Sequence, residues 1–268
     1  MPAYLPPLGF IVMRVGFASI VFILCSLLFA RQKIDFKEDL FKIVVCAITG
    51  CGANMLLFFK GLSITTPING AILMACTPIF VVVFTAIILH ERLTVIRYIG
   101  IGVACLGAML LLGGLNFSFD KQHIWGDIYV AANAIIYSFY LVYAKPLLKK
   151  YNPITLSAYT FGIGFVFVIF FGYNELRETN FNIIPTEIWY YIVFILIGAT
   201  FITYLLNAYA LSKASPYVVG SYIYLQPVLA ILIAILKHTD TITFEKVAYM
   251  FIIFSGIYLV NSKPKEIA

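Results

Sequence analysis

The chain has 268 residues, of which 62% are hydrophobic and only 11% are charged, and its formal net charge is +6. Soluble domains carry about 25% charged residues because their surfaces face water, so this composition excludes a soluble protein of one or two domains. The basic residues lie between apolar runs, where they set membrane orientation, so the positive charge does not predict a nucleic-acid partner.

The apolar residues form runs of about 20, the length that an α-helix needs to cross roughly 30 Å of hydrocarbon. Lipid offers no partner to a free backbone N–H or C=O, so each run is predicted to be a helix. Polar, turn-forming stretches separate the runs. The sequence therefore predicts an all-α polytopic membrane protein with nine visible transmembrane helices, at 8–29, 40–60, 67–89, 95–114, 127–147, 154–173, 188–211, 216–236 and 245–261.

The distribution of Lys and Arg predicts the orientation. One set of segments between the spans carries 12 basic residues, namely Arg31, Lys33, Lys37, Lys42, Arg92, Arg97, Lys145, Lys149, Lys150, Lys213, Lys263 and Lys265. The opposite set carries five, namely Lys60, Lys121, Arg177, Lys237 and Lys246. Basic residues concentrate on the cytoplasmic side, so we expect a multi-pass protein of the inner (cytoplasmic) membrane with a cytoplasmic C-terminus.

The chain contains an internal repeat. Residues 62–111 align without gaps on residues 211–260, at an offset of 149. The seven identical pairs include two prolines of each copy, because Pro67 and Pro78 fall on Pro216 and Pro227.

Earlier in the chain, the stretch 4–10 resembles the stretch 151–157. Together these likenesses predict a first repeat at 1–115 with four helices and a second at 126–262 with five. The counterpart of helix 127–147 would precede Met1, so we expect a gene start placed too late, with a genuine nine-helix protein as the alternative. Two five-helix repeats must insert with opposite topology, which is typical of secondary transporters.

One group of residues carries a resemblance to a known family. Pro78, the turn Glu91–Thr94 (sequence ERLT), Gly100 and Gly107 resemble the fourth and fifth helices of EamA-type permeases in the drug/metabolite transporter superfamily. That family has ten helices in two five-helix repeats, so the resemblance implies that the family's first helix is missing here. The likeness covers essentially the whole chain.

Two further features bear on this resemblance. The second copy departs from the pattern, because Asp240 replaces the glutamate and Tyr249 stands where the second glycine would be. Arg14 resembles the arginine that often lies early in the family's second helix. It is also the one clear charge within a predicted span, where its long stem could reach the outer interface or its guanidinium could bind a carboxylate or phosphate.

Polar side chains within a bilayer are costly and usually face the bundle interior or a cavity. Asn133 and Tyr137 share one face with Tyr140, and Tyr204 and Asn207 share one face with Thr200. The candidate substrate-binding residues are therefore Asn54, Asn133, Tyr137, Tyr204, Asn207, Tyr222, Gln226 and Arg14. The alternative is hydrogen bonding between helices, worth about 0.6 kcal/mol per bond.

Pro78 and Pro227 lie near the middle of their spans at matching positions of the two repeats. Each removes one helical N–H and frees a carbonyl, so both are candidates for a helix break with a gating role. A passive kink that improves packing is the alternative. Val82, one turn beyond Pro78, is expected to face lipid.

No catalytic apparatus is visible. The sequence contains no HExxH, GxSxG or Walker motif, and its five cysteines lack metal-ligand spacing, so we expect neither an enzyme nor a bound metal or cofactor. The span centres contain no Asp, Glu or His, which disfavours a proton relay through a buried carboxylate.

The family resemblance implies a secondary transporter, in particular an exporter, of a small neutral, zwitterionic or anionic metabolite such as an amino acid. Transport would follow alternating access around a cavity at the membrane midplane. A channel-like pore and a non-transporting membrane partner or remnant remain alternatives. The sequence leaves the substrate, the coupling ion and the oligomeric state open.

Overall fold

The computed structural model describes residues 4–91, 93–112, 123–236 and 243–261. Within these ranges the secondary structure is helical throughout, with no strand. The expectations placed on Arg92, Lys121, Lys237, Asp240, Lys263 and Lys265 lie outside the described residues.

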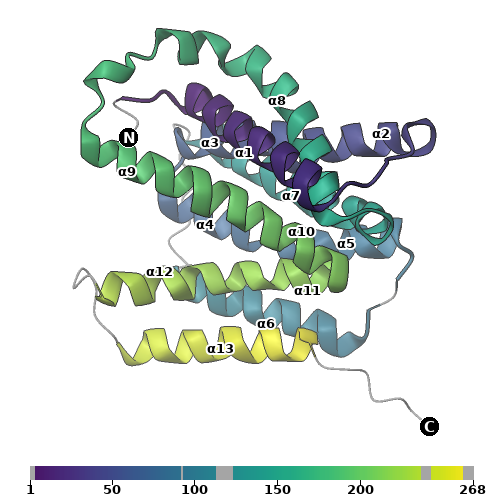
Figure 1. The fold of residues 1–268 in the computed structure, drawn as a ribbon. Helices are drawn as coiled ribbons and strands as arrows, with labels where there is room; N and C mark the ends of the chain where they lie inside the picture. The colour runs from purple at the N-terminus through teal and green to yellow at the C-terminus, as the bar shows by residue number, and fades with distance from the viewer. Residues whose placement is uncertain (1–3, 92, 113–122, 237–242, 262–268) are drawn as a thin grey trace. The chain divides into compact units, whose positions relative to one another are not determined.

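Thirteen α-helices and four short helices of other types follow one another in the described ranges (Figure 1). They are α1 (Pro7–Phe29), α2 (Phe36–Ala47), η1 (Ile48–Gly52), α3 (Ala53–Leu62), α4 (Pro67–Ala75), α5 (Thr77–Ile88), α6 (Val95–Leu111), α7 (Ile124–Lys150), α8 (Pro153–Glu178), η2 (Phe181–Ile183), α9 (Thr186–Phe194), η3 (Ile195–Ile202), α10 (Thr203–Lys213), α11 (Pro216–Ser221), η4 (Tyr222–Tyr224), α12 (Leu225–Leu236) and α13 (Phe244–Asn261).

These elements correspond to the predicted spans. Eight helical segments of the described chain are long and apolar enough to cross a membrane, and the shorter apolar helix Val95–Leu111 corresponds to the remaining predicted span, 95–114. Some helices extend beyond the predicted spans. Helix α7 ends at Lys150 and α8 at Glu178, whereas the predicted spans end at 147 and 173.

Proline fixes several helix starts. Pro7, Pro67, Pro153 and Pro216 occupy the first turns of α1, α4, α8 and α11, where a missing N–H costs nothing. At the start of α8, the side chain of Asn152 also accepts a hydrogen bond from the backbone N–H of Ile154 at 2.9 Å. The turn signals between apolar runs therefore predict most helix starts.

The chain folds into two compact units, and each unit contains helices from both predicted repeats. The first unit comprises residues Met1–Ser63 and Tyr143–Ala214, and the second comprises Ile64–Val142 and Ser215–Ala268. Helix α7 contributes its first part to the second unit and its last part to the first. The compact units therefore differ from the repeat boundaries at 1–115 and 126–262, which stay a prediction about the sequence.

In the first unit, α1 packs along α8 in the antiparallel sense. Gly9 lies against the backbone of Leu176, whereas Gly16, two turns further along α1, lies against Phe165. A Cβ atom on Gly172 of α8 would come within 2.5 Å of the Leu8 carbonyl oxygen, so this position has room only for glycine. Small residues of this kind let membrane helices approach closely.

In the second unit, α6 and α13 lie side by side, also antiparallel (Figure 1). Gly100 faces Gly256 and Val260, and Gly107 faces Ile253. A Cβ atom on Gly256 would come within 2.4 Å of the Ala104 backbone nitrogen. The glycines that carry the family resemblance are therefore helix-packing positions.

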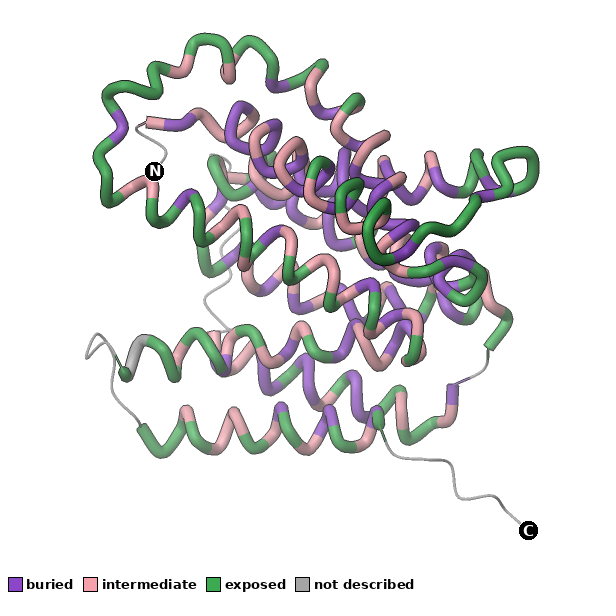
Figure 2. Tube along the Cα trace, viewed as in Figure 1, coloured by how far each residue is buried: buried purple, intermediate pink, exposed green. Residues whose placement is uncertain are grey.

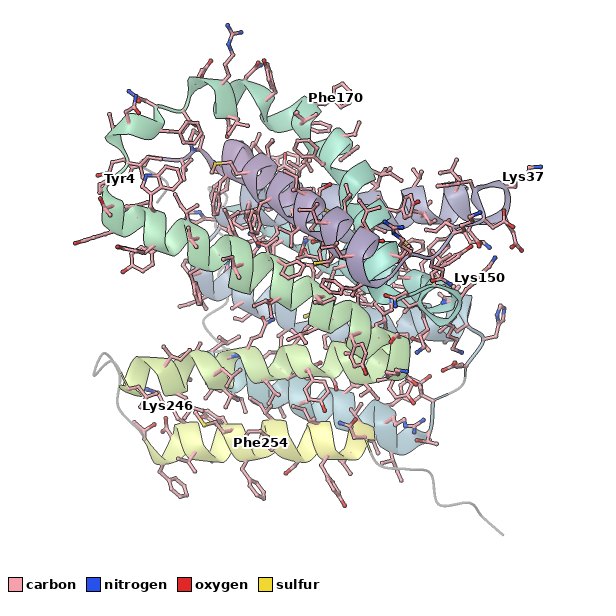
Figure 3. All side chains as sticks on the ribbon, viewed as in Figure 1. Tyr4, Lys37, Lys150, Phe170, Lys246 and Phe254 are labelled. Carbon is pink, nitrogen blue, oxygen red and sulfur yellow. The ribbon has the colours of Figure 1, made fainter. Side chains whose placement is uncertain are left out.

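The outer faces of the helices are apolar, as a lipid environment requires. Exposed residues recur along α9 and α13 (Figure 2), and Phe170 on α8, labelled in Figure 3, is 80% exposed. The expectation for Val82 was wrong: Val82 is 5% exposed, whereas the neighbouring Val83 is 47% exposed. The 3.6-residue period alone did not fix which side of α5 meets lipid.

Candidate functional site

Two membrane segments contain a π-helical stretch, namely the segment that includes α3 and the segment that includes α10. Both stretches belong to the first unit. They are η1, at Ile48–Gly52, and η3, at Ile195–Ile202. Adding the repeat offset of 149 to 48–52 gives 197–201, which lies within η3. The two π-helices therefore overlap at the offset of the predicted repeat, and such irregularities are frequent at functional sites.

Threonine hydroxyls satisfy backbone carbonyls of η3. The Thr200 hydroxyl donates to the Ile195 carbonyl at 2.8 Å, and the Thr203 hydroxyl donates to the Gly198 carbonyl at 2.9 Å. Each bond joins residues five apart, which is the spacing of the π-helix itself. These bonds stabilise the wider π-helical turn, in which the α-helical pattern of backbone hydrogen bonds is interrupted.

Arg14 reaches this turn from α1. It is 8% exposed, and its Nε donates to the Thr200 hydroxyl at 2.9 Å. The guanidinium carbon lies 4.9 Å from the ring centroid of Phe59 and 5.9 Å from that of Phe10. This burial excludes the alternative in which the side chain reaches interfacial water.

The other candidates of the first unit lie on the helices that follow the π-helical stretches. Asn54 is buried on α3, directly after η1. The ring of Tyr204 on α10 packs edge-on against Phe161, with 4.9 Å between centroids. Asn207 lies three residues further along α10 and is half-buried. The two Asn side chains and Tyr204 thus share one unit with Arg14.

The second unit contains the proline-associated breaks. Helix α4 ends at Ala75 and α5 begins at Thr77, so the interruption directly precedes Pro78. In the other repeat, the 3₁₀ turn Tyr222–Tyr224 separates α11 from α12, which contains Pro227. Both predicted proline positions therefore lie beside a real helix interruption.

A hydroxyl of α7 contacts the chain next to the first break. The Ser138 hydroxyl lies 2.9 Å from the Thr77 carbonyl and 2.6 Å from the Ala134 carbonyl, so it can donate to the broken segment. Thr77 is the first residue of α5, so this bond connects α7 to the helix that follows the break.

The remaining candidates also belong to the second unit. Asn133 is buried on α7, and the ring of Tyr137 stacks on that of Tyr140 with centroids 6.1 Å apart. Tyr222 and Gln226 are exposed. Because the candidates are divided between two units, their grouping around one cavity stays a prediction.

A buried lysine was missed. Lys145, counted above among the basic residues of the cytoplasmic side, lies within α7 and is 8% exposed. Its Nζ donates to the carbonyls of Leu211 at 2.7 Å, Ser212 at 3.3 Å and Ala214 at 2.8 Å. The ammonium therefore caps the C-terminus of α10, where positive charge is favourable.

Polar clusters hold the two ends of α7. Its last residue, Lys150 (labelled in Figure 3), lies 2.6 Å from Asp39 of α2, and the Tyr151 hydroxyl donates to the same carboxylate at 2.8 Å. Near its first residue, the Asp127 carboxylate accepts hydrogen bonds from Thr65 and from Asn69. The sequence could not predict these pairs, because their members lie 58 to 112 residues apart.

A hollow of about 450 Å³ opens between α1 and α8 in the first unit. Its lining is mostly apolar and includes Ile23, Leu27, Ile163 and Val166. None of the candidate residues lines it, and Leu27 and Val166 are exposed, so this hollow faces the surroundings of the unit. It is therefore not the substrate site proposed below.

Comparisons with known proteins agree on one family. The model of the EamA-like transporter family matches residues 1–113 and 124–262. An uncharacterized transporter of Archaeoglobus fulgidus is 27% identical over 262 residues, which is 97% of this chain and 90% of that protein. The uncharacterized transporter YyaM of Bacillus subtilis is 24% identical over 254 residues, which is 93% of this chain and 83% of that protein.

Two other relatives add detail. A protein of Streptantibioticus cattleyicolor, described as a "probable terminal-alkyne amino-acid exporter", is 29% identical over 132 residues, covering 49% of this chain and 43% of that protein. A solved crystal structure superposes with a TM-score of 0.78 at 19% identity, covering 96% of this chain and 88% of that one. The structural likeness shows the same fold.

Proposed function

Because this chain belongs to the EamA-like transporter family, we propose that it is a secondary carrier that exports a small neutral, zwitterionic or anionic metabolite, such as an amino acid. It is a multi-pass membrane protein, and its family transports small molecules across the lipid bilayer. Transport proceeds by alternating access around a cavity at the membrane midplane, with export towards the outside.

The matched helix interruptions carry this proposal. The first unit contains two π-helices and the second unit two proline-associated breaks, and each kind occurs once in each predicted repeat. Discontinuous helices at matching positions of two repeats are the strongest pointer to a substrate site in secondary transporters. A passive membrane partner has no need of four such interruptions.

Antiparallel packing supports opposite insertion of the two repeats. The sequence repeat equates α1 with α8 and α6 with α13, and each of these pairs is antiparallel. Two copies related by an axis in the membrane plane have this arrangement. In alternating access, two such inverted copies exchange their conformations between the two states of the carrier.

The amino-acid suggestion has one external support. The relative from Streptantibioticus cattleyicolor carries an amino-acid exporter description, although its similarity spans half of this chain. The polar candidates Asn133, Tyr137, Asn207 and Gln226 provide the amide and hydroxyl groups that a zwitterionic or neutral metabolite requires.

Export is tested by mass spectrometry of the culture medium. Cells that express the full chain should accumulate at least one small metabolite in the medium that cells with an empty vector retain. Tyr137→Phe, Asn207→Ala and Gln226→Ala should each lower export per folded molecule by roughly 5- to 150-fold, the equivalent of about 1–3 kcal/mol of lost hydrogen bonding.

The matched control for these variants is Val83→Ala, at an exposed position of α5, which should export normally. If all three polar variants lose thermal stability while export per folded molecule stays normal, the polar stripes serve packing. If no metabolite depends on the chain, the proposal of export fails.

A further inference from the structure

The charge of Arg14 is not balanced by a carboxylate of the described chain. No Asp or Glu of the described residues forms an ion pair with it. The acids of the first unit that lie close to α1 and α2 are engaged elsewhere: Glu175 accepts hydrogen bonds from the backbone N–H groups of Leu8 and Gly9, and Asp39 binds Lys42 and Lys150. A buried cation without a counter-charge in a membrane segment is costly, which makes it a functional-site candidate.

The guanidinium is held in a fixed position. Its Nε donates to Thr200, and the Thr200 hydroxyl proton is directed to Ile195, so Thr200 can serve Arg14 as an acceptor. The rings of Phe59 and Phe10 lie within 6 Å of the guanidinium carbon, a range in which an aromatic ring attracts a cation. These contacts fix the head group without neutralising it.

The fixed head group leaves donors for another molecule. An arginine side chain has five N–H donors, and within the described chain only that on Nε has a hydrogen-bond acceptor. The four N–H groups on the two terminal nitrogens form a planar fork whose geometry matches a carboxylate. Lysine could not present two parallel donors in this way.

We propose that Arg14 binds the carboxylate of the transported metabolite, through its terminal guanidinium nitrogens. This inference rests on the proposed transport function and narrows its substrate class to carboxylates, among them amino acids in their zwitterionic form. Thr200 belongs to the π-helix η3. The hydrogen bond between Arg14 and Thr200 therefore connects the proposed substrate-binding residue to an irregular turn of the carrier.

The test is a binding measurement on the purified full chain in detergent. The probes are the twenty L-amino acids, their 2-oxo acids, the corresponding primary amides and inorganic phosphate, and thermal stabilisation is followed against probe concentration. At least one carboxylate should stabilise the protein saturably, and its amide should bind at least about 10-fold more weakly, because the charge-assisted pair is lost.

Variants then assign the effect to Arg14. Arg14→Gln should weaken carboxylate binding by about 10-fold or more, and Arg14→Lys should give a smaller loss, because it keeps the charge and loses the fork. Thr200→Val should also weaken binding while the charge stays. Lys60→Gln, an exposed cation on α3, is the matched control and should bind as the unmodified chain does.

Several results would overturn the inference. They are equal binding of a carboxylate and its amide, stabilisation by phosphate alone, the absence of stabilisation by every carboxylate, or unchanged carboxylate affinity in Arg14→Lys and Thr200→Val. The last two variants decide the matter if Arg14→Gln does not fold. Failure of export with carboxylate binding intact would contradict the proposed function and leave the Arg14 assignment standing.

Discussion

The ammonium of Lys145 illustrates how one residue stabilises a membrane helix end. Three carbonyls at the end of α10 accept hydrogen bonds from it, and the residue is buried. Lys145→Met should therefore lower the free energy of unfolding by about 2–3 kcal/mol, since bonds to a charged group are lost and buried carbonyls are left without a donor. Unfolding in mixed micelles measures this change.

Lys149→Met is the matched control, because Lys149 lies on the same helix and is exposed. It should change the free energy of unfolding by less than about 0.5 kcal/mol. Equal losses in the two variants would show that the cap contributes little.

The cost of a polar group in lipid predicts burial of single residues, whereas the binding roles assigned to them stay a prediction. Arg14, Asn54 and Asn133 stand out by this criterion, and all three are buried. The same criterion could not identify Phe59 as the ring over Arg14, because that contact joins residues of distant helices. Burial of Lys145 was missed because a lysine near a span end also fits a segment at the membrane surface.

At the scale of the helix pair, glycine contacts set how closely α6 and α13 approach. Gly256→Ala should cost about 1–3 kcal/mol of stability, because its Cβ would lie 2.4 Å from the Ala104 nitrogen. Gly102→Ala, on the opposing helix, has no atom within 4 Å of its added Cβ and should be neutral or stabilising by up to about 1 kcal/mol. Thermal unfolding of both variants makes the comparison, and similar melting temperatures would contradict it.

The helix breaks make a separate prediction about rate. Pro78→Ala and Pro227→Ala should restore backbone hydrogen bonding and slow turnover more than they weaken substrate binding, because the interruptions allow the helices to rearrange. Pro146→Ala is the control, since Pro146 lies within α7, which continues through it without interruption. Transport rate and affinity are measured on reconstituted protein. A loss of affinity with normal turnover would assign the prolines to binding.

Element-level prediction found the nine segments and both proline-associated breaks, because length, apolarity and proline act locally. It did not find the π-helices. Gly50, Gly52 and Gly198 lie within them, but glycine within an apolar run is also typical of close helix packing. In η3, the hydroxyls of Thr200 and Thr203 bond to carbonyls five residues back, and Arg14 reaches Thr200 from α1, a contact that exists only in the folded chain.

At the scale of the whole molecule, the distribution of basic residues predicts the topology. Single cysteines introduced at Lys33 and Lys149 in a cysteine-free background should react with a membrane-impermeant reagent only after the membrane is opened, whereas a cysteine at Arg177 should react in intact cells. Helix α8, which begins after Lys149 and contains Arg177 in its last turn, has 26 residues and is therefore roughly 39 Å long. Labelling of both positions from one side would contradict the span count.

The fold class followed from composition and from the length of the apolar runs, whereas the division into two units did not. Sequence repeats suggest that residues near one another in the chain pack together, yet each unit combines helices of both repeats. This interleaving depends on long-range pairs such as α1 with α8 and α6 with α13, whose contacts no local pattern encodes.

The central claim, that the chain is a carrier, is tested most directly by counterflow in proteoliposomes. Vesicles containing the full chain are loaded with the unlabelled metabolite identified by the export experiment and diluted into a trace of its labelled form. A carrier that alternates between two states should accumulate label transiently above its equilibrium level, and vesicles with Arg14→Gln should show at least about 10-fold less accumulation. Label that only equilibrates, without an overshoot, would indicate a channel, and no uptake above protein-free vesicles would contradict transport altogether.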